Sequence, residues 1–249
     1  MNMQHASRVI ALIPAYQEAR RVGQTVRTLL SLPHIDEVIV VDDGSTDGTA
    51  GEAEASGATV VRIPRNGGKG AALTAGVRLI LSRTVSPGAV LFADADLETS
   101  AAHLTGLLGP VLSSRCDMAI ADLPPQSHAA GFGITVGLAR RGLQTLTGRR
   151  FREPLSGQRA VTAAALPWLL PFGRGFGCEV GMTLAAVDAG LRIEEISLPL
   201  THAATGRNVA GIHHRARQAR DVGVALIRAG TARALRRRVR GRPRPVAPG

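Results

Sequence analysis

The sequence predicts an α/β protein with one mainly parallel sheet and helices on both faces. Short apolar runs, such as those at 8–14 and 37–41, alternate along the chain with segments of helical length. These runs are apolar at consecutive positions rather than at every second one, which is typical of strands buried on both faces. A chain of 249 residues with 45% apolar content can bury the core that such a sheet requires.

In the first half of the chain the expected elements follow one another through short connections. Ser45 or Thr46 can cap the second helix, because either hydroxyl can accept a hydrogen bond from a first-turn amide. We expect strands at 8–14, 37–41, 59–63, 90–93 and 118–121, and helices at 25–32, 47–55, 70–81 and 101–112.

After residue 121 the regular alternation of strands and helices ends. We expect helices at 134–146, 163–170 and 179–189, one strand at 192–198, loops at 149–158 and 201–211, and a basic helix from 212 to about 240. The interpretation is one domain over 1–211, whose regular first half, about 1–122, is followed by a less regular second half, about 123–211. Residues 212–249 then form a basic helix and a Pro/Arg tail that we expect to be disordered.

Composition excludes several classes of protein. The longest uninterrupted apolar runs, such as 222–227, fall far short of the roughly 18 residues that a membrane span needs. No basic region followed by an apolar run opens the chain, as a signal peptide would. The two cysteines, Cys116 and Cys178, do not have the spacing of a metal site or a disulfide framework. These features predict a cytoplasmic protein.

The net charge of +11 is concentrated at the C-terminal end. Residues 207–249 contain twelve arginines and one acid, Asp221, which gives +11, and the remaining 18 basic and 18 acidic residues balance. Such an Arg-rich helix suits the anionic surface of a membrane, so we expect peripheral binding at the cytoplasmic face. Aromatic residues make up only 3% of the chain, so any nucleic-acid binding is expected to be non-specific and salt-sensitive.

Carboxylates follow the strand expected at 90–93. Asp94 and Asp96 stand at spacing i, i+2, which on an extended chain places them on one side, and Glu98 continues that side. Ligands of open α/β sheets bind at the carboxyl ends of the strands. Oxygen donors at this edge suit Mg²⁺ or Mn²⁺ together with phosphate oxygens. Taken alone, the three acids favour an ordinary solvated turn at the end of a strand.

Two further segments support a shared crevice at this edge of the sheet. Asp42-Asp43 ends the second expected strand, where a carboxylate can accept hydrogen bonds from a nucleobase or a ribose, or simply form an Asx turn. Asn66-Gly-Gly-Lys69-Gly70 precedes a helix, whose N-terminus favours anions. Lys69 is the only lysine in the chain. The segment lacks the spacing of a P-loop.

Four motifs together resemble those of family-2 glycosyltransferases, and most closely the dolichyl-phosphate mannose synthase-like branch. They are Pro14-Ala-Tyr-Gln-Glu18, Val41-Asp-Asp-Gly-Ser-Thr-Asp47, Asn66-Gly-Gly-Lys-Gly70 and Asp94-Ala-Asp-Leu-Glu98. The resemblance is specific through residue 122 and looser beyond it, and it implies a nucleotide-sugar half at about 1–122 followed by an acceptor half at about 123–211. It implies the GT-A fold, a Rossmann-like sheet that binds a nucleoside-diphosphate sugar, UDP- or GDP-linked, with Mg²⁺ or Mn²⁺ as cofactor.

The resemblance also implies roles for individual residues. The residues that would line the nucleotide-sugar pocket are Pro14, Tyr16, Glu18, Val41, Asp43, Lys69, Asp94, Ala95 and Asp96. The metal ligands would be Asp94, Asp96 and Glu98, with His202 as a further candidate. The catalytic residues would be Asp96, Lys69 and Glu179. Glu179 is included because it matches an acid that faces the acceptor in related enzymes.

In the second half, three residues are candidates for contact with a phosphorylated acceptor. Ser156 belongs to a Ser-Gly element that resembles the acceptor loop of the family. Arg159 and Arg207 are candidates because arginine binds phosphoryl oxygens in a bidentate manner. A polyprenyl-phosphate acceptor follows from the resemblance to mannose synthases and from the basic C-terminal helix.

Other interpretations remain open at this stage. A small soluble phosphorylated acceptor, as in glucosyl-phosphoglycerate synthases, is the main alternative. A nucleotidyltransferase shares the sheet and the metal chemistry, but the Gly-rich basic loop that it needs after the first strand is missing. A basic nucleic-acid-binding protein would explain the C-terminal arginines but not the acidic strand ends.

Overall fold

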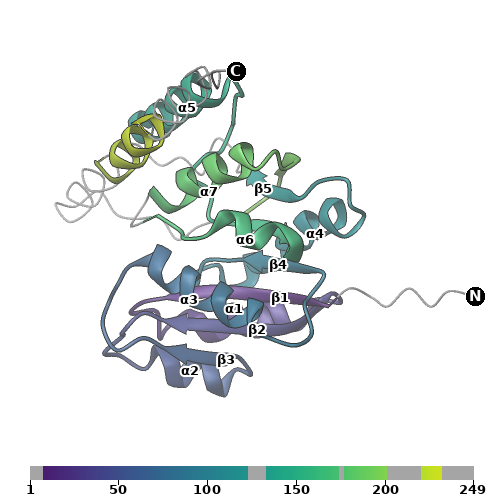
Figure 1. Cartoon of the computed structure of the whole chain (residues 1–249). Coiled ribbons are helices and arrows are strands. Elements are labelled where there is room, and N and C mark those ends of the chain that lie inside the picture. The colour runs from purple at the N-terminus through teal and green to yellow at the C-terminus, as the bar shows by residue number, and fades with distance from the viewer. Residues whose placement is uncertain (1–7, 123–132, 174–176, 201–219, 232–249) are drawn as a thin grey trace, which may run out of the picture.

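A seven-stranded sheet with helices on both faces forms the centre of the protein (Figure 1), as a computed structural model shows. The structure describes residues 8–122, 133–173, 177–200 and 220–231. The strand order is β3-β2-β1-β4-β6-β5-β7. The strands are β1 (Val9–Ala15), β2 (Ile35–Asp42), β3 (Thr59–Arg62), β4 (Ala89–Phe92), β5 (Met118–Asp122), β6 (Arg159–Thr162) and β7 (Ile193–Ser197).

The helices fill the connections between these strands. They are α1 (Val22–Leu30), α2 (Thr49–Ala55), α3 (Lys69–Leu81), α4 (Thr105–Leu112), α5 (Gly133–Thr147), α6 (Leu166–Leu169) and α7 (Gly177–Asp188). Two 3₁₀ helices, η1 (Glu98–Leu104) and η3 (Ala163–Ala165), precede α4 and α6. Residues 220–231 form a further helix. The predicted α/β class with a mainly parallel sheet is therefore confirmed.

Strand β6 is the one antiparallel member of the sheet among the described residues. It pairs with β4 and with β5, so that Arg159 lies opposite both Phe92 and Ile120. All other strand pairs are parallel. The carboxyl ends of the six parallel strands therefore meet at one edge, and the residues that precede β6 reach that same edge.

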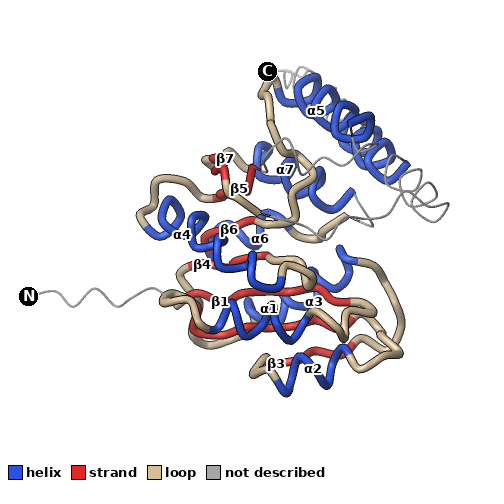
Figure 2. The backbone as a smooth tube through the Cα atoms, turned by 180° about the vertical axis from the view of Figure 1, so that it is seen from behind, coloured by secondary structure: helices blue, strands red, loops and turns tan. Residues whose placement is uncertain are grey.

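The core consists of two apolar layers, one on each face of the sheet. Figure 2 shows the path of the backbone that carries them. Successive residues of β1 alternate between the layers, because side chains of a strand point to opposite faces. Val9 and Ala11 pack with α1 and α4, whereas Ile10 and Leu12 pack with α3, α6 and α7. Gly76 of α3 lies so close to Leu12 that a Cβ there would collide with its side chain. This packing holds the N-terminal ends of α3 and α7 at the edge where the carboxyl ends of the parallel strands meet, the ligand edge of the sheet.

The helix over residues 220–231 packs against the body of the protein. Its Val222 is fully buried in a third apolar cluster with Leu143 of α5 and Val180 of α7. Leu226 packs so close to Gly142 that a Cβ at Gly142 would collide with it. The two helices lie side by side in Figure 1, where the C-terminal one is yellow. The apolar side of this helix therefore packs on α5 and α7, and the expected boundary at 211, which lies outside the described residues, stays a prediction. No helix in the described ranges is long and apolar enough to span a bilayer.

Three local expectations differ from the structure. No element was expected at 159–162, where β6 lies between the expected loop and helix, because four residues of mixed character carry too little periodicity to mark a strand. The segment 163–170 is a 3₁₀ turn followed by a four-residue helix. Helix α2 begins at Thr49 without a side-chain cap, because Ser45 and Thr46 instead accept hydrogen bonds from Gln17.

Candidate active site

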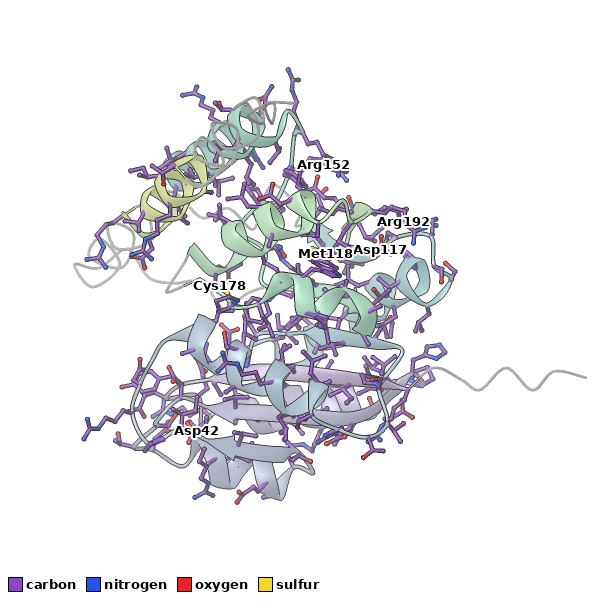
Figure 3. The ribbon with its side chains drawn as sticks, in the orientation of Figure 1. Asp42, Asp117, Met118, Arg152, Cys178 and Arg192 are labelled. Atoms are coloured by element: carbon purple, nitrogen blue, oxygen red, sulfur yellow. The ribbon has the colours of Figure 1, made fainter. Side chains whose placement is uncertain are left out.

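The ligand edge of the sheet brings together residues that lie far apart in the sequence. Figure 3 shows Asp42, at the end of β2, and Cys178, at the start of α7, on one side of the molecule, with Asp117 and Arg192 on the other. Glu179 follows Cys178 and is buried in the first turn of α7. The second half of the chain thus contributes a carboxylate to the edge at which β1, β2 and β4 end.

The turn after β4 is held in a defined shape by Thr25 of α1. The hydroxyl of this fully buried residue donates to the carbonyl oxygen of Ala95 and accepts from the amide of Glu98, both at 2.8 Å. The chain is therefore turned rather than extended here, and Glu98 has a φ of +49°. The expectation that Glu98 continues the side occupied by Asp94 and Asp96 is wrong, because its premise was an extended chain.

Lys69 forms the centre of the site. Its ammonium nitrogen Nζ lies 2.7 Å from Oδ1 of Asp94 and 2.8 Å from Oε1 of Glu179. Burial by itself lowers the pKa of Lys69, but the charges of the two carboxylates and their hydrogen bonds outweigh burial and hold that pKa above its usual value. Lys69 is therefore a permanent cation that joins the end of β4 to the start of α7.

Asp43 holds the loop that presents Lys69. Its two carboxylate oxygens accept hydrogen bonds from the backbone amides of Gly67, at 2.9 Å, and Gly68, at 2.7 Å. Gly68 has a φ of +84°, a conformation that residues with a Cβ rarely adopt. The expected direct contact of Asp43 with base or ribose stays a prediction, and the contacts present are with this loop.

Replacement of Asp43 by Ala is expected to lower the free energy of unfolding by about 2 kcal/mol, because two backbone amides lose a charged acceptor. The affinity for a nucleotide should fall as well, because the loop held by Asp43 positions Lys69, which follows Gly68 directly in the chain. Urea titration and calorimetric titration with UDP measure the two effects. Asp42→Asn is the matched control, because Oδ1 of that side chain can still accept from the amide of Ser45. Equal stability of the two variants would contradict this role.

The segment after β1 contributes a second charged group. Tyr16 is 47% exposed and free to stack on a ligand, whereas Glu18 forms a bidentate pair with Arg21. Burial raises the pKa of Glu18 and the nearby Asp96 adds to this, while Arg21 opposes both. Nη1 of Arg21 lies 3.9 Å from Oδ2 of Asp96. The guanidinium of Arg21 therefore reaches the second aspartate of the turn Asp94-Ala95-Asp96 after β4, the Asp-x-Asp turn.

Three of the residues expected to line the nucleotide pocket offer little side-chain surface. Val41 is fully buried in the core layer that contains α3, so its side chain is not available to a ligand. Pro14 pairs with Val41 in the sheet and is partly buried. Ala95 is buried and its carbonyl is engaged by Thr25. Any contact from Val41 or Ala95 is therefore through the backbone.

Arg159 does not fit its expected role in binding phosphate. It is fully buried and donates to the carbonyl oxygens of Ser156 and Pro154 and to the hydroxyl of Thr183 in α7. The expectation is corrected for a physical reason: the guanidinium points into the protein as the first residue of β6. Ser156 is also buried, and its hydroxyl donates to Gln158. Arg159 thus fixes the loop before β6 onto α7.

Glu153, in the same loop, is expected to make stability depend on pH. Burial raises the pKa of Glu153 to about 7; the charge of Arg140 opposes this, and Asp122 and Glu195 add smaller effects in the same direction as burial. The folded protein therefore binds more protons than the unfolded chain between pH 4.5 and 7, and stability falls as the pH rises through this window. The loss is on the order of 3 kcal/mol.

Denaturant titrations of wild type and Glu153→Gln at pH 5 and pH 8 measure this loss. The wild type should lose stability relative to the variant on going to pH 8, because the amide does not ionise. Glu52→Gln, at an exposed position on α2, should follow the wild type at both pH values. A Glu153→Gln variant with the same pH dependence as wild type would refute the assignment.

The carboxylates at this edge suit a divalent cation whose remaining ligands are oxygens of a bound substrate. Among the described residues, no three His, Cys, Asp or Glu side chains are grouped as ligands. Asp94 is engaged by Lys69, whereas the partly exposed Asp96 lies at the turn with the longer contact to Arg21. Mg²⁺ is commonly held by one or two carboxylates together with substrate phosphates. One or two protein carboxylates therefore suffice here.

Two of the predicted site residues, His202 and Arg207, lie outside the described residues. Three residues at the site were not predicted from the sequence: Arg21, Thr25 and Gln158, whose amide donates to Asp94. Each acts on a partner about 64 to 75 positions away, so no local pattern marks it. The antiparallel pairing of β6, had it been recognised, would have placed Gln158 at this edge.

A family model described as Glycosyl transferase family 2 matches residues 10–154. The chain therefore belongs to glycosyl transferase family 2. This match covers the strands β1, β2 and β4 that carry the acidic ends and the loop that carries Lys69.

Individual relatives support this membership. The glucosyl-3-phosphoglycerate synthase of Mycobacterium tuberculosis is 30% identical over 207 residues, which cover 74% of this chain and 62% of the relative. The glycosyltransferase AglJ of Haloferax volcanii is 30% identical over 188 residues, covering 74% and 60%. The chain thus spans about three fifths of the length of these curated relatives.

Solved structures of the mycobacterial synthase have the same fold. The structure in complex with Mn²⁺, UDP and glucosyl-3-phosphoglycerate aligns with a TM-score of 0.73 at 28% identity, covering 90% of this chain and 80% of that one. The structure with Mg²⁺ and UDP aligns with a TM-score of 0.74 at 27% identity. The predicted GT-A fold is therefore confirmed.

Proposed function

We propose that this protein transfers a sugar from a UDP-linked donor to a small phosphorylated acceptor, with Mg²⁺ or Mn²⁺ as cofactor. The observation that carries the proposal is the position of Lys69, whose ammonium is fixed between Asp94 of the nucleotide half and Glu179 of the acceptor half. A cation at this junction lies where a departing diphosphate and an incoming acceptor would meet. Similarity to structures that contain UDP and a divalent metal supports the choice of donor and cofactor.

Asp96 is the residue that would hold the metal, with Asp94 beside it. When bound there, a divalent cation would neutralise the negative charge that develops on the leaving diphosphate. Lys69 and Arg21 add positive charge from the protein, and both are fixed by carboxylates before any ligand binds. Such pre-positioned charges stabilise a transition state more than mobile ones do, because they need no reorganisation during the reaction.

The buried carboxylate of Glu179 is the candidate general base. If the reacting group of the acceptor is a hydroxyl, its proton must be removed, and Glu179 is the described acid that the acceptor half presents at the junction. If the reacting group is a phosphate oxygen, it is already a nucleophile and needs no base. Because Glu179 also holds the ammonium of Lys69, its replacement is expected to lower turnover in both cases, so the identity of the acceptor and not this variant distinguishes the two chemistries.

A polyprenyl-phosphate acceptor at a membrane is the second candidate function. The observation in its favour is the outer face of the helix over 220–231, where Val224 and the 68% exposed Ile227 lie beside the exposed Arg220 and Arg228. Apolar and basic side chains on one helical face suit an anionic lipid surface. The relatives that are glucosyl-3-phosphoglycerate synthases favour the small acceptor over this candidate.

One assay tests the proposal and separates the two candidates. Purified protein is incubated with UDP-glucose and Mn²⁺, and UDP release is measured with 3-phosphoglycerate, with polyprenyl phosphate in anionic vesicles, or without acceptor. We expect release that depends on 3-phosphoglycerate and stops with chelator. Stimulation by the vesicles alone would favour the second candidate. Absence of release and of UDP binding under all conditions would overturn both.

A further inference from the structure

The segment before β6 reaches across the sheet to the aspartate at the end of β4. Gln158 is only 1% exposed, and Nε2 of its side chain lies 2.6 Å from Oδ2 of Asp94. Nζ of Lys69 lies 2.7 Å from Oδ1 of the same carboxylate. Each oxygen of Asp94 therefore accepts a hydrogen bond from a different half of the protein.

The amide of Gln158 is held in the orientation that this contact requires. Its Oε1 accepts a hydrogen bond from the hydroxyl of Ser156 at 3.2 Å, which leaves Nε2 to point at the carboxylate. The backbone carbonyl of Gln158 accepts from the amide of Ala121 in β5 at 3.0 Å. The buried Arg159 fixes the same loop through the carbonyl oxygen of Ser156. Gln158 is therefore immobile before any ligand binds.

Gly157 makes this close approach possible. A Cβ at this position would collide with Nζ of Lys69 and would lie 3.0 Å from Oδ1 of Asp94. Lys69 cannot easily withdraw, because two carboxylates hold its ammonium. The loop backbone therefore packs directly against the ion pair, and Gly157 and Gln158 together enclose it from the acceptor side.

We propose that Gln158 is a positioning residue that fixes the carboxylate of Asp94 against Lys69 for binding of the nucleoside diphosphate. This inference rests on the proposed function. A side chain that is already ordered loses no rotamer freedom when a ligand binds, so fixing it in advance increases affinity. Because Gln158 belongs to the acceptor half, donor affinity depends on a residue outside the nucleotide-binding half.

Gln158→Met tests this role, because Met has a similar volume and no donor. We expect UDP affinity in the presence of Mn²⁺, measured by calorimetry, to fall about tenfold to hundredfold, as for loss of a hydrogen bond to a charged group. The KM for UDP-glucose should rise similarly, while kcat at saturation changes less than about threefold, since the contact exists before the reaction begins. Gln24→Met on α1 is the matched control and should bind UDP as wild type does.

A double-mutant cycle shows whether Gln158 acts through Asp94. In an Asp94→Ala background, Gln158→Met should cause little further loss of UDP affinity, because its partner is already gone. A full additional loss, or unchanged affinity of the single Gln158→Met variant, would overturn the inference. If Gln158→Met does not fold, Ser156→Ala serves instead, because loss of the Ser156 hydroxyl frees the side-chain amide of Gln158 to rotate. Unchanged UDP affinity of Ser156→Ala would also overturn the inference. A wild type that binds no UDP with Mn²⁺ would overturn the proposed function and this inference together.

Discussion

Asp96→Ala is expected to abolish sugar transfer while the fold stays intact. Asp96 is only partly buried, and its one described ionic contact is the 3.9 Å approach to Arg21, so its loss changes stability little. The same side chain is the carboxylate best placed to bind a divalent cation beside the diphosphate. Removing one ligand opens the coordination shell of a cation that has few protein ligands.

The measurement is turnover of UDP-glucose over a range of Mn²⁺ concentrations, with thermal unfolding as the check on folding. Glu98→Gln is the informative control, because the turn after β4 directs this exposed residue away from the arrangement expected from the sequence. It should keep at least half of the wild-type activity. Turnover by Asp96→Ala that matches wild type in the presence of chelator would disprove the metal-dependent mechanism.

Lys69→Met is expected to reduce kcat by about a hundredfold to a thousandfold. Removal of a fixed positive group from a site where negative charge develops has effects of this size. The substitution also leaves the buried Glu179 beside Asp94 without the cation between them. Breaking such a pair should lower the free energy of unfolding by about 2–3 kcal/mol, less than for a fully buried pair, because Lys69 keeps some exposure.

Single-turnover kinetics and urea titration separate these two consequences of Lys69→Met. Lys69→Arg is the control that keeps the charge, and it should recover most of the stability but only part of the activity, because a planar guanidinium cannot place one nitrogen between the two carboxylates in the same way. If Lys69→Met retains wild-type kcat, the cation serves the fold alone and not the reaction.

The sequence alone was sufficient to predict the nucleotide half of the fold. Its strands are continuous apolar runs, and the acidic residues at their ends mark the ligand edge, because parallel strands end on the same side of a sheet. The motif that contains Lys69 was also identified, although its two partners were not paired with it. These features are local, and a local pattern in the chain is enough to detect them.

The acceptor half was predicted less well because its interactions are long-range. Arg159 was expected to bind a phosphate of the acceptor, but it belongs to the rare fully buried arginines and three oxygens of the protein satisfy its guanidinium. Thr25 has the sequence context of an ordinary helical residue, yet it fixes the Asp-x-Asp turn some 70 positions away. Such roles depend on which elements become neighbours, and the four residues of β6 do not reveal this.

The position of β6 also has a consequence for the order in which the protein folds. Strands β1 to β4 can pair using contacts within residues 9–92, whereas β5 is separated from β4 by a strand that comes some forty residues later in the chain. Ordering a long loop before any contact forms has an entropic cost that slows folding. We therefore expect the four-stranded part to assemble first and β6 to close the sheet afterwards. Since Gln158 and Glu179 arrive only with this closure, a nascent or partly folded chain holds the acidic strand ends but not yet a working site.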